Sequence, residues 1–133
     1  MARCFAHTSY YIALVNPDDE THELALKLTT ELDGEIVTTG WVLNELANYL
    51  VRPPNRALFL DILAQMRADP SVTTIPMTQE TFDRGLTLYA ERLDKSWSVT
   101  DCISFLVMED MSIADALTSD HHFEQAGFNV LLK

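Results

Sequence analysis

The stretch Ser98–Phe128, SVTDCISFLVMEDMSIADALTSDHHFEQAGF, decides the predicted fold of this chain. Its segment Cys102–Met108 is too apolar for an exposed helix, so we expect a helix that is buried on most sides. Ile113–Thr118 is typical of a short strand. Asp101 stands where the helix begins, and Asp120 lies in the turn that leaves the strand. Both carboxylates are therefore expected at the carboxyl edge of a sheet, where ligands bind in open α/β proteins.

Outside this stretch, predicted strands alternate with predicted helices. The expected strands, besides Ile113–Thr118, are Arg3–Ala6, Glu35–Thr39, Ser71–Pro76 and Asn129–Leu132. Helices are expected from Thr8 or Ser9 (natural N-caps) to Asn16, from Asp18–Glu20 to Leu32, and over Trp41–Val51, Asn55–Arg67 and Thr78–Leu93. This alternation predicts a mainly parallel sheet with helices on both faces. Without an internal repeat or linker, residues 1–133 are expected to form a single domain.

Hydrophobic spacing predicts which helix faces are buried. In the helix Thr78–Leu93, the residues Phe82, Leu86 and Tyr89 are spaced as one apolar stripe, which we expect to face the core. In the helix Trp41–Val51, Glu45 lies away from the apolar face. A charged residue on that face is available for a site or for solvent.

The length and the composition of the chain restrict the class of protein to which it can belong. The chain has 133 residues, of which 47% are hydrophobic, so it is long and apolar enough for a folded core. Its apolar runs are too short to cross a membrane, and its start lacks the pattern of a signal peptide. The two cysteines, Cys4 and Cys102, fall in predicted buried elements and are expected to stay reduced. We therefore expect a cytoplasmic protein that does not bind membranes.

The net charge is −11, from twenty acidic and nine basic residues. Such a charge opposes a passive nucleic-acid binder, which would carry a basic stripe. It remains compatible with an enzyme that meets phosphates through a bound divalent cation, and it suits a basic partner. For most of the acidic residues, a contribution to solubility is sufficient to explain their presence.

Three carboxylates are candidates for a metal site, namely Asp101, Asp120 and Glu45. Carboxylates crowded at a sheet edge repel one another unless a cation neutralises them, and Mg²⁺ prefers oxygen ligands. Such an ion can activate a water molecule and stabilise charge on a scissile phosphate. Simpler interpretations remain open, because Asp101 and Asp120 could only cap helices and Glu45 could be a solvated residue on a helix face.

Four segments carry a resemblance to the PIN domain family, and within it to the VapC-type toxins of toxin–antitoxin pairs. His7-Thr-Ser after the first strand resembles the opening of a PIN domain, where Asp-Thr-Ser is usual. The segments Thr38–Leu46, Thr100–Cys102 and Ala116–Gly127 resemble its later acidic segments. The resemblance implies a three-layer α/β/α sandwich and a ribonuclease dependent on Mg²⁺ or Mn²⁺. It also implies a small antitoxin with a basic segment that blocks the site, and a homodimer.

The resemblance also implies roles for particular residues. Asp101, Asp120 and Glu45 would hold the metal, with position 7 as the fourth member of the site. The hydroxyls of Thr8, Ser9 and Thr118 would orient ligands or a phosphate, although such residues are more often caps.

His7 departs from the family pattern, because an aspartate is usual at this position. Histidine offers nitrogen to a metal that prefers oxygen and removes a negative charge from the site. A lone histidine at a strand end can also serve only in local hydrogen bonding. The residue could be a natural variant, an inactivating substitution, or a change selected because the active toxin harms its host. The alternative function is therefore a PIN-fold binding module with little or no catalysis, acting through antitoxin or RNA contact.

Two other kinds of site are not favoured by the sequence. The adjacent His121 and His122 do not predict a zinc site, because neighbouring side chains within a helix point about 100° apart and no further Cys or His pair completes a ligand set. A phospho-receiver domain would need a lysine at the end of a later strand, and Lys27, Lys95 and Lys133 do not occupy such a position.

Overall fold

The computed structural model describes residues 3–133 and shows a five-stranded sheet. The strands lie in the order β3-β2-β1-β4-β5, and all four pairings are parallel. They are β1 (Cys4–Ala6), β2 (Ile36–Thr39), β3 (Val72–Ile75), β4 (Asp115–Leu117) and β5 (Asn129–Val130). The predicted mainly parallel sheet is confirmed, and each strand lies within a residue or two of its expected position.

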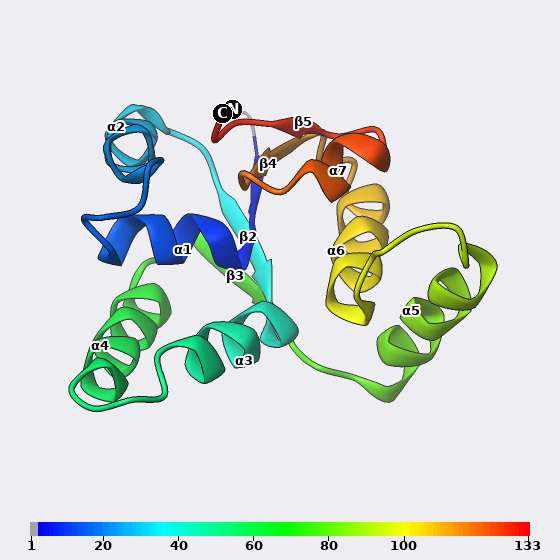
Figure 1. Cartoon of the computed structure of the whole chain (residues 1–133), viewed down its shortest axis with the longest axis horizontal. Coiled ribbons are helices and arrows are strands. Elements are labelled where there is room, and N and C mark those ends of the chain that lie inside the picture. Colours follow the sequence, from blue (N-terminus) through cyan, green and yellow to red (C-terminus); the bar gives the residue numbers. More distant parts are fainter. Residues whose placement is uncertain (1–2) are drawn as a thin grey trace.

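Helices cover both faces of this sheet (Figure 1). On one side lie α1 (Thr8–Val15), α2 (His22–Glu31), α3 (Gly40–Tyr49) and α4 (Asn55–Ala68). On the other side lie α5 (Gln79–Glu91), α6 (Val99–Asp110) and α7 (His121–Gln125). The three-layer α/β/α arrangement is confirmed. Within the described part of the chain, no helix has the length and hydropathy that a membrane span requires.

The strand order places the topological switch point of the sheet between β1 and β4. From β1 the chain moves through α1 and α2 to β2 on one side of the sheet, whereas β4 continues to β5 on the other. Neighbouring parallel strands whose connections leave in opposite directions form the point where open α/β sheets bind ligands. Residues that follow Ala6 and Leu117 are therefore placed at this switch point.

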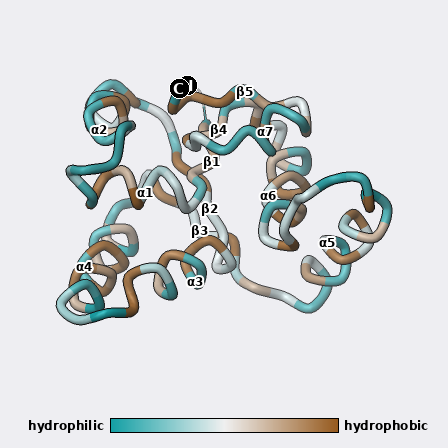
Figure 2. Tube along the Cα trace, viewed as in Figure 1, coloured by the Kyte–Doolittle hydropathy of each residue, from teal (hydrophilic) through white to brown (hydrophobic). Residues whose placement is uncertain are grey.

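The core lies on both faces of the sheet and includes the predicted buried helix. Phe5, Val37 and Ala116 in the strands are fully buried, and α6 contributes several buried residues that include Ile103 and Met108. Figure 2 shows hydrophobic residues along the central strands and on the parts of the helices that face them. This packing anchors the start of α6 beside the carboxyl edge of the sheet.

The predicted buried stripe on α5 is wrong. Phe82, Leu86 and Tyr89 are exposed by 37%, 39% and 48%. The helix instead packs on α6 through Gly85, where an added Cβ would lie only 2.5 Å from Cγ1 of Ile103. A residue without a side chain lets two helices approach closely, so the contact face of α5 is chosen by its fit to α6. The larger hydrophobic residues remain in contact with water.

Two helix starts also differ from the predictions. The N-cap of α1 is His7 and makes no side-chain capping bond, so the hydroxyls of Thr8 and Ser9 are not caps. The second helix begins at His22 and not at the acidic run, because Asp19 holds a turn there. Its Oδ1 accepts hydrogen bonds from the amide and hydroxyl of Thr21, at 2.8 and 2.7 Å.

Candidate metal centre

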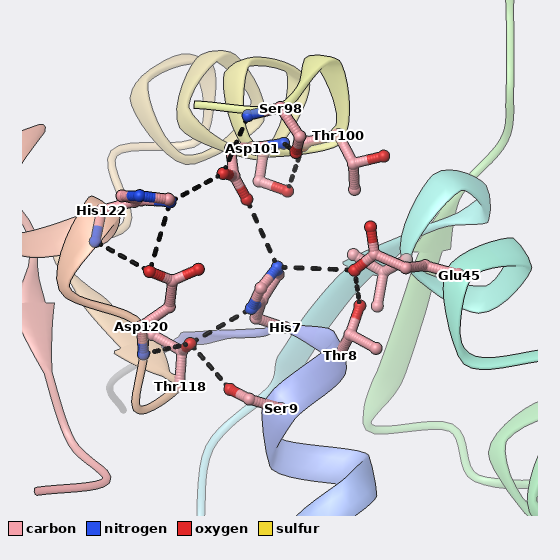
Figure 3. A network of polar contacts seen from close by, with 12 residues as sticks. His7, Thr8, Ser9, Glu45, Ser98, Thr100, Asp101, Thr118, Asp120 and His122 are labelled. Atoms are coloured by element: carbon pink, nitrogen blue, oxygen red, sulfur yellow. Dashed lines mark hydrogen bonds and ion pairs between the residues drawn. The ribbon is translucent and has the colours of Figure 1, made fainter. Parts of the chain in front are cut away.

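A polar cluster centred on His7 lies at the ends of β1 and β4 (Figure 3). His7 directly follows β1, and Thr118 directly follows β4. Asp101 comes from the first turn of α6, Asp120 from the N-cap of α7, and Glu45 from α3. The fold thus brings the four positions predicted from sequence to one place, although they are separated by up to 113 residues along the chain.

The imidazole of His7 is buried and points between two carboxylates. Its Nδ1 lies 3.1 Å from Oγ1 of Thr118. Its Nε2 lies 3.5 Å from Oδ1 of Asp101 and 3.9 Å from Oε1 of Glu45. In the described part of the chain, this buried Nε2 has no hydrogen-bond partner. A buried nitrogen in such a setting is placed either to carry a proton facing the carboxylates or to bind a cation together with them.

Asp101 caps α6 and faces the cluster at the same time. Its amide donates to Oγ of Ser98 at 2.9 Å, and its Oδ2 accepts from the Ser98 amide at 3.1 Å, which completes a capping box. Its Oδ1 is directed toward His7. Burial opposes ionisation of this carboxyl. The contacts with His7, the Ser98 amide and His122 outweigh burial and hold the pKa of Asp101 below its ordinary value.

Asp120 likewise combines a capping role with a place in the cluster. Its Oδ1 accepts from the His122 amide at 2.9 Å, which caps α7. Its own amide donates to Oγ1 of Thr118 at 3.1 Å. Donor atoms of His7, Asp101 and Asp120 all lie within 4.8 Å of one another. Capping and metal binding were alternatives for Asp101 and Asp120 in the sequence, but here the cap itself fixes each carboxylate in position.

Glu45 occupies the more open side of the cluster. Its side chain is 42% exposed, and its Oε1 accepts a hydrogen bond from Oγ1 of Thr8 at 2.6 Å. It lies outside the tight group formed by His7, Asp101 and Asp120. Thr8 therefore orients a carboxylate that stands between the buried cluster and solvent.

Ser9 and Thr118 connect α1 with the loop after β4. Their hydroxyl oxygens lie 2.8 Å apart, and Oγ of Ser9 also accepts from the Ser119 amide at 3.2 Å. Because Thr118 contacts Nδ1 of His7, this small network sets the orientation of the imidazole ring. Phe123 supports the same ring from the side, at 4.8 Å between ring centroids.

Sequence reasoning missed His122 as a member of the cluster. Its Nδ1 lies 3.1 Å from Oδ2 of Asp101 and 3.3 Å from Oδ1 of Asp120. The sequence signal was its position two residues after an N-cap aspartate, from which a side chain can reach back to the cap. The expectation that His121 and His122 point apart is wrong here. The two histidines are the first two residues of α7, and their rings nevertheless lie 4.5 Å apart.

Comparison with known proteins identifies the family. The model of the PIN domain matches residues 5–129. The chain belongs to the PIN domain family. Two relatives from different strains of Mycobacterium tuberculosis, both named 23S rRNA-specific endonuclease VapC20, are 27% identical over 124 residues, covering 93% of this chain and 94% of theirs. The predicted resemblance to VapC-type proteins is confirmed.

A solved structure also resembles this PIN domain closely. It is the crystal structure of Mycobacterium tuberculosis VapC20, described as a Sarcin-Ricin loop cleaving toxin. The two structures superpose with a TM-score of 0.84 at 26% sequence identity, over 94% of this chain and 95% of the other. Most of this PIN domain thus shares its fold with that protein.

Proposed function

We propose that this PIN domain is an endoribonuclease toxin of the VapC type that depends on a divalent cation, and that His7 impairs its activity. The observation that carries the proposal is the group of His7, Asp101 and Asp120, whose donor atoms lie within 4.8 Å of one another beside the ends of β1 and β4. Family membership and the VapC20 relatives, which are named as rRNA endonucleases, support the reaction class.

The donor set fits a divalent cation. Asp101, Asp120 and Glu45 would hold Mg²⁺ or Mn²⁺, with the unpaired Nε2 of His7 as an additional ligand. When bound, the ion would neutralise charge on a scissile phosphate and activate a water molecule. Because imidazole nitrogen is a poor ligand for Mg²⁺ and a better one for Mn²⁺, the histidine should shift the preference toward Mn²⁺.

Neighbouring hydroxyls would keep these groups in position. Thr8 orients the carboxylate of Glu45, and Thr118 with Ser9 orients His7. The partly exposed Glu45 lies where a phosphate would enter from solvent. With a net charge of −11, the protein repels RNA at long range, so the cation must supply much of the local attraction.

The second candidate function is a PIN-fold binding module with little or no catalysis. The buried Nε2 of His7 favours it, because the imidazole ring faces the carboxylates from a position that a bound cation would need. Such a protein could still bind an antitoxin or RNA through the same surface.

The proposed partners are RNA, a small antitoxin with a basic segment, and a second copy of this chain. A cluster of carboxylates invites an arginine, whose guanidinium forms paired, charge-assisted hydrogen bonds. The exposed apolar side chains of α5, and Leu93 just after this helix at 85% exposure, support the homodimer, because an interface covering them would remove apolar surface from water.

A cleavage assay tests the function. The unmodified protein and an Asp101→Asn variant are incubated with an RNA fragment that carries the sarcin–ricin loop, in Mg²⁺ and in Mn²⁺. We expect slow cleavage that is faster in Mn²⁺ and absent in the variant. Equal cleavage by both proteins would refute the assigned site. RNA binding without cleavage in either metal would favour the binding module.

A further inference from the structure

A second group of metal-binding side chains lies beside the cluster centred on His7. Asp120, His121 and His122 each place one donor atom so that all three lie within 4.8 Å of one another. Both imidazoles turn their Nδ1 toward the same atom, Oδ1 of Asp120, at 3.8 Å for His121 and 3.3 Å for His122. Two nitrogen donors and one carboxylate thus converge at the start of α7.

These separations suit the ligands of a single small cation. Zinc lies about 2.0–2.1 Å from nitrogen and oxygen ligands, so two ligands of a tetrahedral ion stand about 3.3–3.4 Å apart. The observed separations of 3.3 and 3.8 Å need little adjustment to reach this arrangement. Two histidines and a carboxylate also form a recurrent zinc ligand set that leaves one position open.

Capping of α7 does not explain the two imidazoles. The cap uses the backbone amide of His122 and the carboxylate of Asp120, and needs neither ring. The side chain of His121 is 71% exposed, yet its Nδ1 faces the carboxylate. His122 is only 19% exposed and is also held by Asp101, so one nitrogen is fixed and the other is reachable from solvent.

The neighbouring donor group, centred on His7, also contains an imidazole. Nε2 of His7 is buried without a hydrogen-bond partner among the described residues and faces Asp101 and Glu45, and His7 belongs with Asp120 to a separate group of possible metal ligands. Asp120 is therefore common to two sets of donors, each of which contains nitrogen. Imidazole donors suit zinc and its neighbours in the first transition row, whereas Mg²⁺ prefers oxygen.

We propose that Asp120, His121 and His122 form a site for a borderline divalent transition metal, with zinc as its representative. The site lies beside the proposed Mg²⁺ or Mn²⁺ position and shares Asp120 with it. Binding would exchange the contact between His122 and Asp101 for a bond to the metal. The proposal does not depend on ribonuclease activity, since it concerns binding alone.

The experiment is a zinc titration of tag-free, metal-stripped protein by calorimetry, in the presence of excess Mg²⁺. We expect one zinc ion per chain and a loss of affinity of about tenfold or more in His121→Asn. The high exposure of His121 makes this variant safe for folding. His22→Asn is the matched control, because His22 lies on α2 and contacts the carbonyl oxygen of Ala13, and it should bind zinc like the unmodified protein.

Histidine ring resonances in NMR spectra provide the second measurement. Zinc should shift the signals of His121 and His122 and leave those of His22 in place. Unchanged zinc affinity in His121→Asn would overturn the proposal, as would zinc-induced shifts confined to His7. Failure of RNA cleavage, by contrast, would affect only the proposed function.

Discussion

Replacing His7 with aspartate should destabilise the metal-free protein and create a strong response to Mg²⁺. In the unmodified protein, Nε2 of His7 lies 3.5 Å from Oδ1 of Asp101 and 3.9 Å from Oε1 of Glu45. The shorter aspartate would place a full negative charge roughly 6 Å from each, and at an effective dielectric of about 20 each pair costs about 2–3 kcal/mol. Solvent screens the pair with Glu45, whose side chain is 42% exposed, so we discount that contribution.

The net cost is therefore about 3 kcal/mol, which a domain of ordinary stability survives. For a chain of this size, such a loss lowers Tm by about 10–15 °C in EDTA. A cation at about 100 times its Kd restores about 2.7 kcal/mol, so Mg²⁺ should recover most of that Tm. The unmodified protein should show a smaller response to Mg²⁺, because its histidine supplies neither the charge nor the oxygen ligand.

Thermal melts followed by circular dichroism, with and without Mg²⁺, measure this difference, and calorimetry gives the affinity. His22→Asp is the control, because it adds the same charge on α2, away from the cluster. The same His7→Asp protein should cleave RNA faster and slow growth when expressed without an antitoxin. A variant with unchanged Tm in EDTA and no added Mg²⁺ response would show that position 7 is not in the site. Stronger metal binding without cleavage would keep the site and favour the binding module.

Three further predictions follow from the contacts of the cluster and of α5. Asp101→Asn or Asp120→Asn, made in the His7→Asp background, should abolish RNA cleavage while circular dichroism shows an intact fold. In the protein that retains His7, Asp101→Asn should lower the free energy of unfolding by about 1–2 kcal/mol, because charge-assisted hydrogen bonds are lost. The pKa of Asp101 is lowered from 3.8 in the folded state, so the carboxylate contributes its full stabilisation above pH 3.8 and loses it as the pH falls through the folded pKa. Urea melts of the unmodified protein should therefore show a steeper loss of stability below pH 3.8 than urea melts of Asp101→Asn. Gly85→Ala should cost about 1–3 kcal/mol, since the added Cβ would meet Ile103 at 2.5 Å, whereas Ala90→Gly on the exposed side of α5 should change stability by only about 1 kcal/mol.

Charge reversal tests the proposed antitoxin contact. If an arginine of the antitoxin enters the cluster, Asp101→Lys combined with Asp120→Lys should abolish complex formation in a pull-down or by calorimetry. Reversal of the exposed Glu31 on α2 to lysine is a control of the same charge change and should leave the complex intact. A complex that survives the double reversal would place the antitoxin elsewhere.

Local patterns in the sequence were sufficient for the element order and for the place of each carboxylate. Alternating strands and helices predicted a parallel sheet, and the polar residues before apolar runs marked the starts of α6 and α7. Asp101 and Asp120 could be placed because the end of a strand or the start of a helix is a local property. The histidine that follows the first strand was visible as a departure from the family pattern, because position 7 aligns with its usual aspartate.

Only the tertiary structure decided which surfaces meet and what His7 and His122 contact. The periodicity of α5 gave the direction of an apolar stripe, but the close approach at Gly85 turned a different face toward α6. Likewise, the bridging position of His122 between Asp101 and Asp120 depends on how α6 and α7 pack at the edge of the sheet. Sequence spacing reports local geometry, whereas distances between residues far apart in the chain are set by strand order and by the fit of packed side chains.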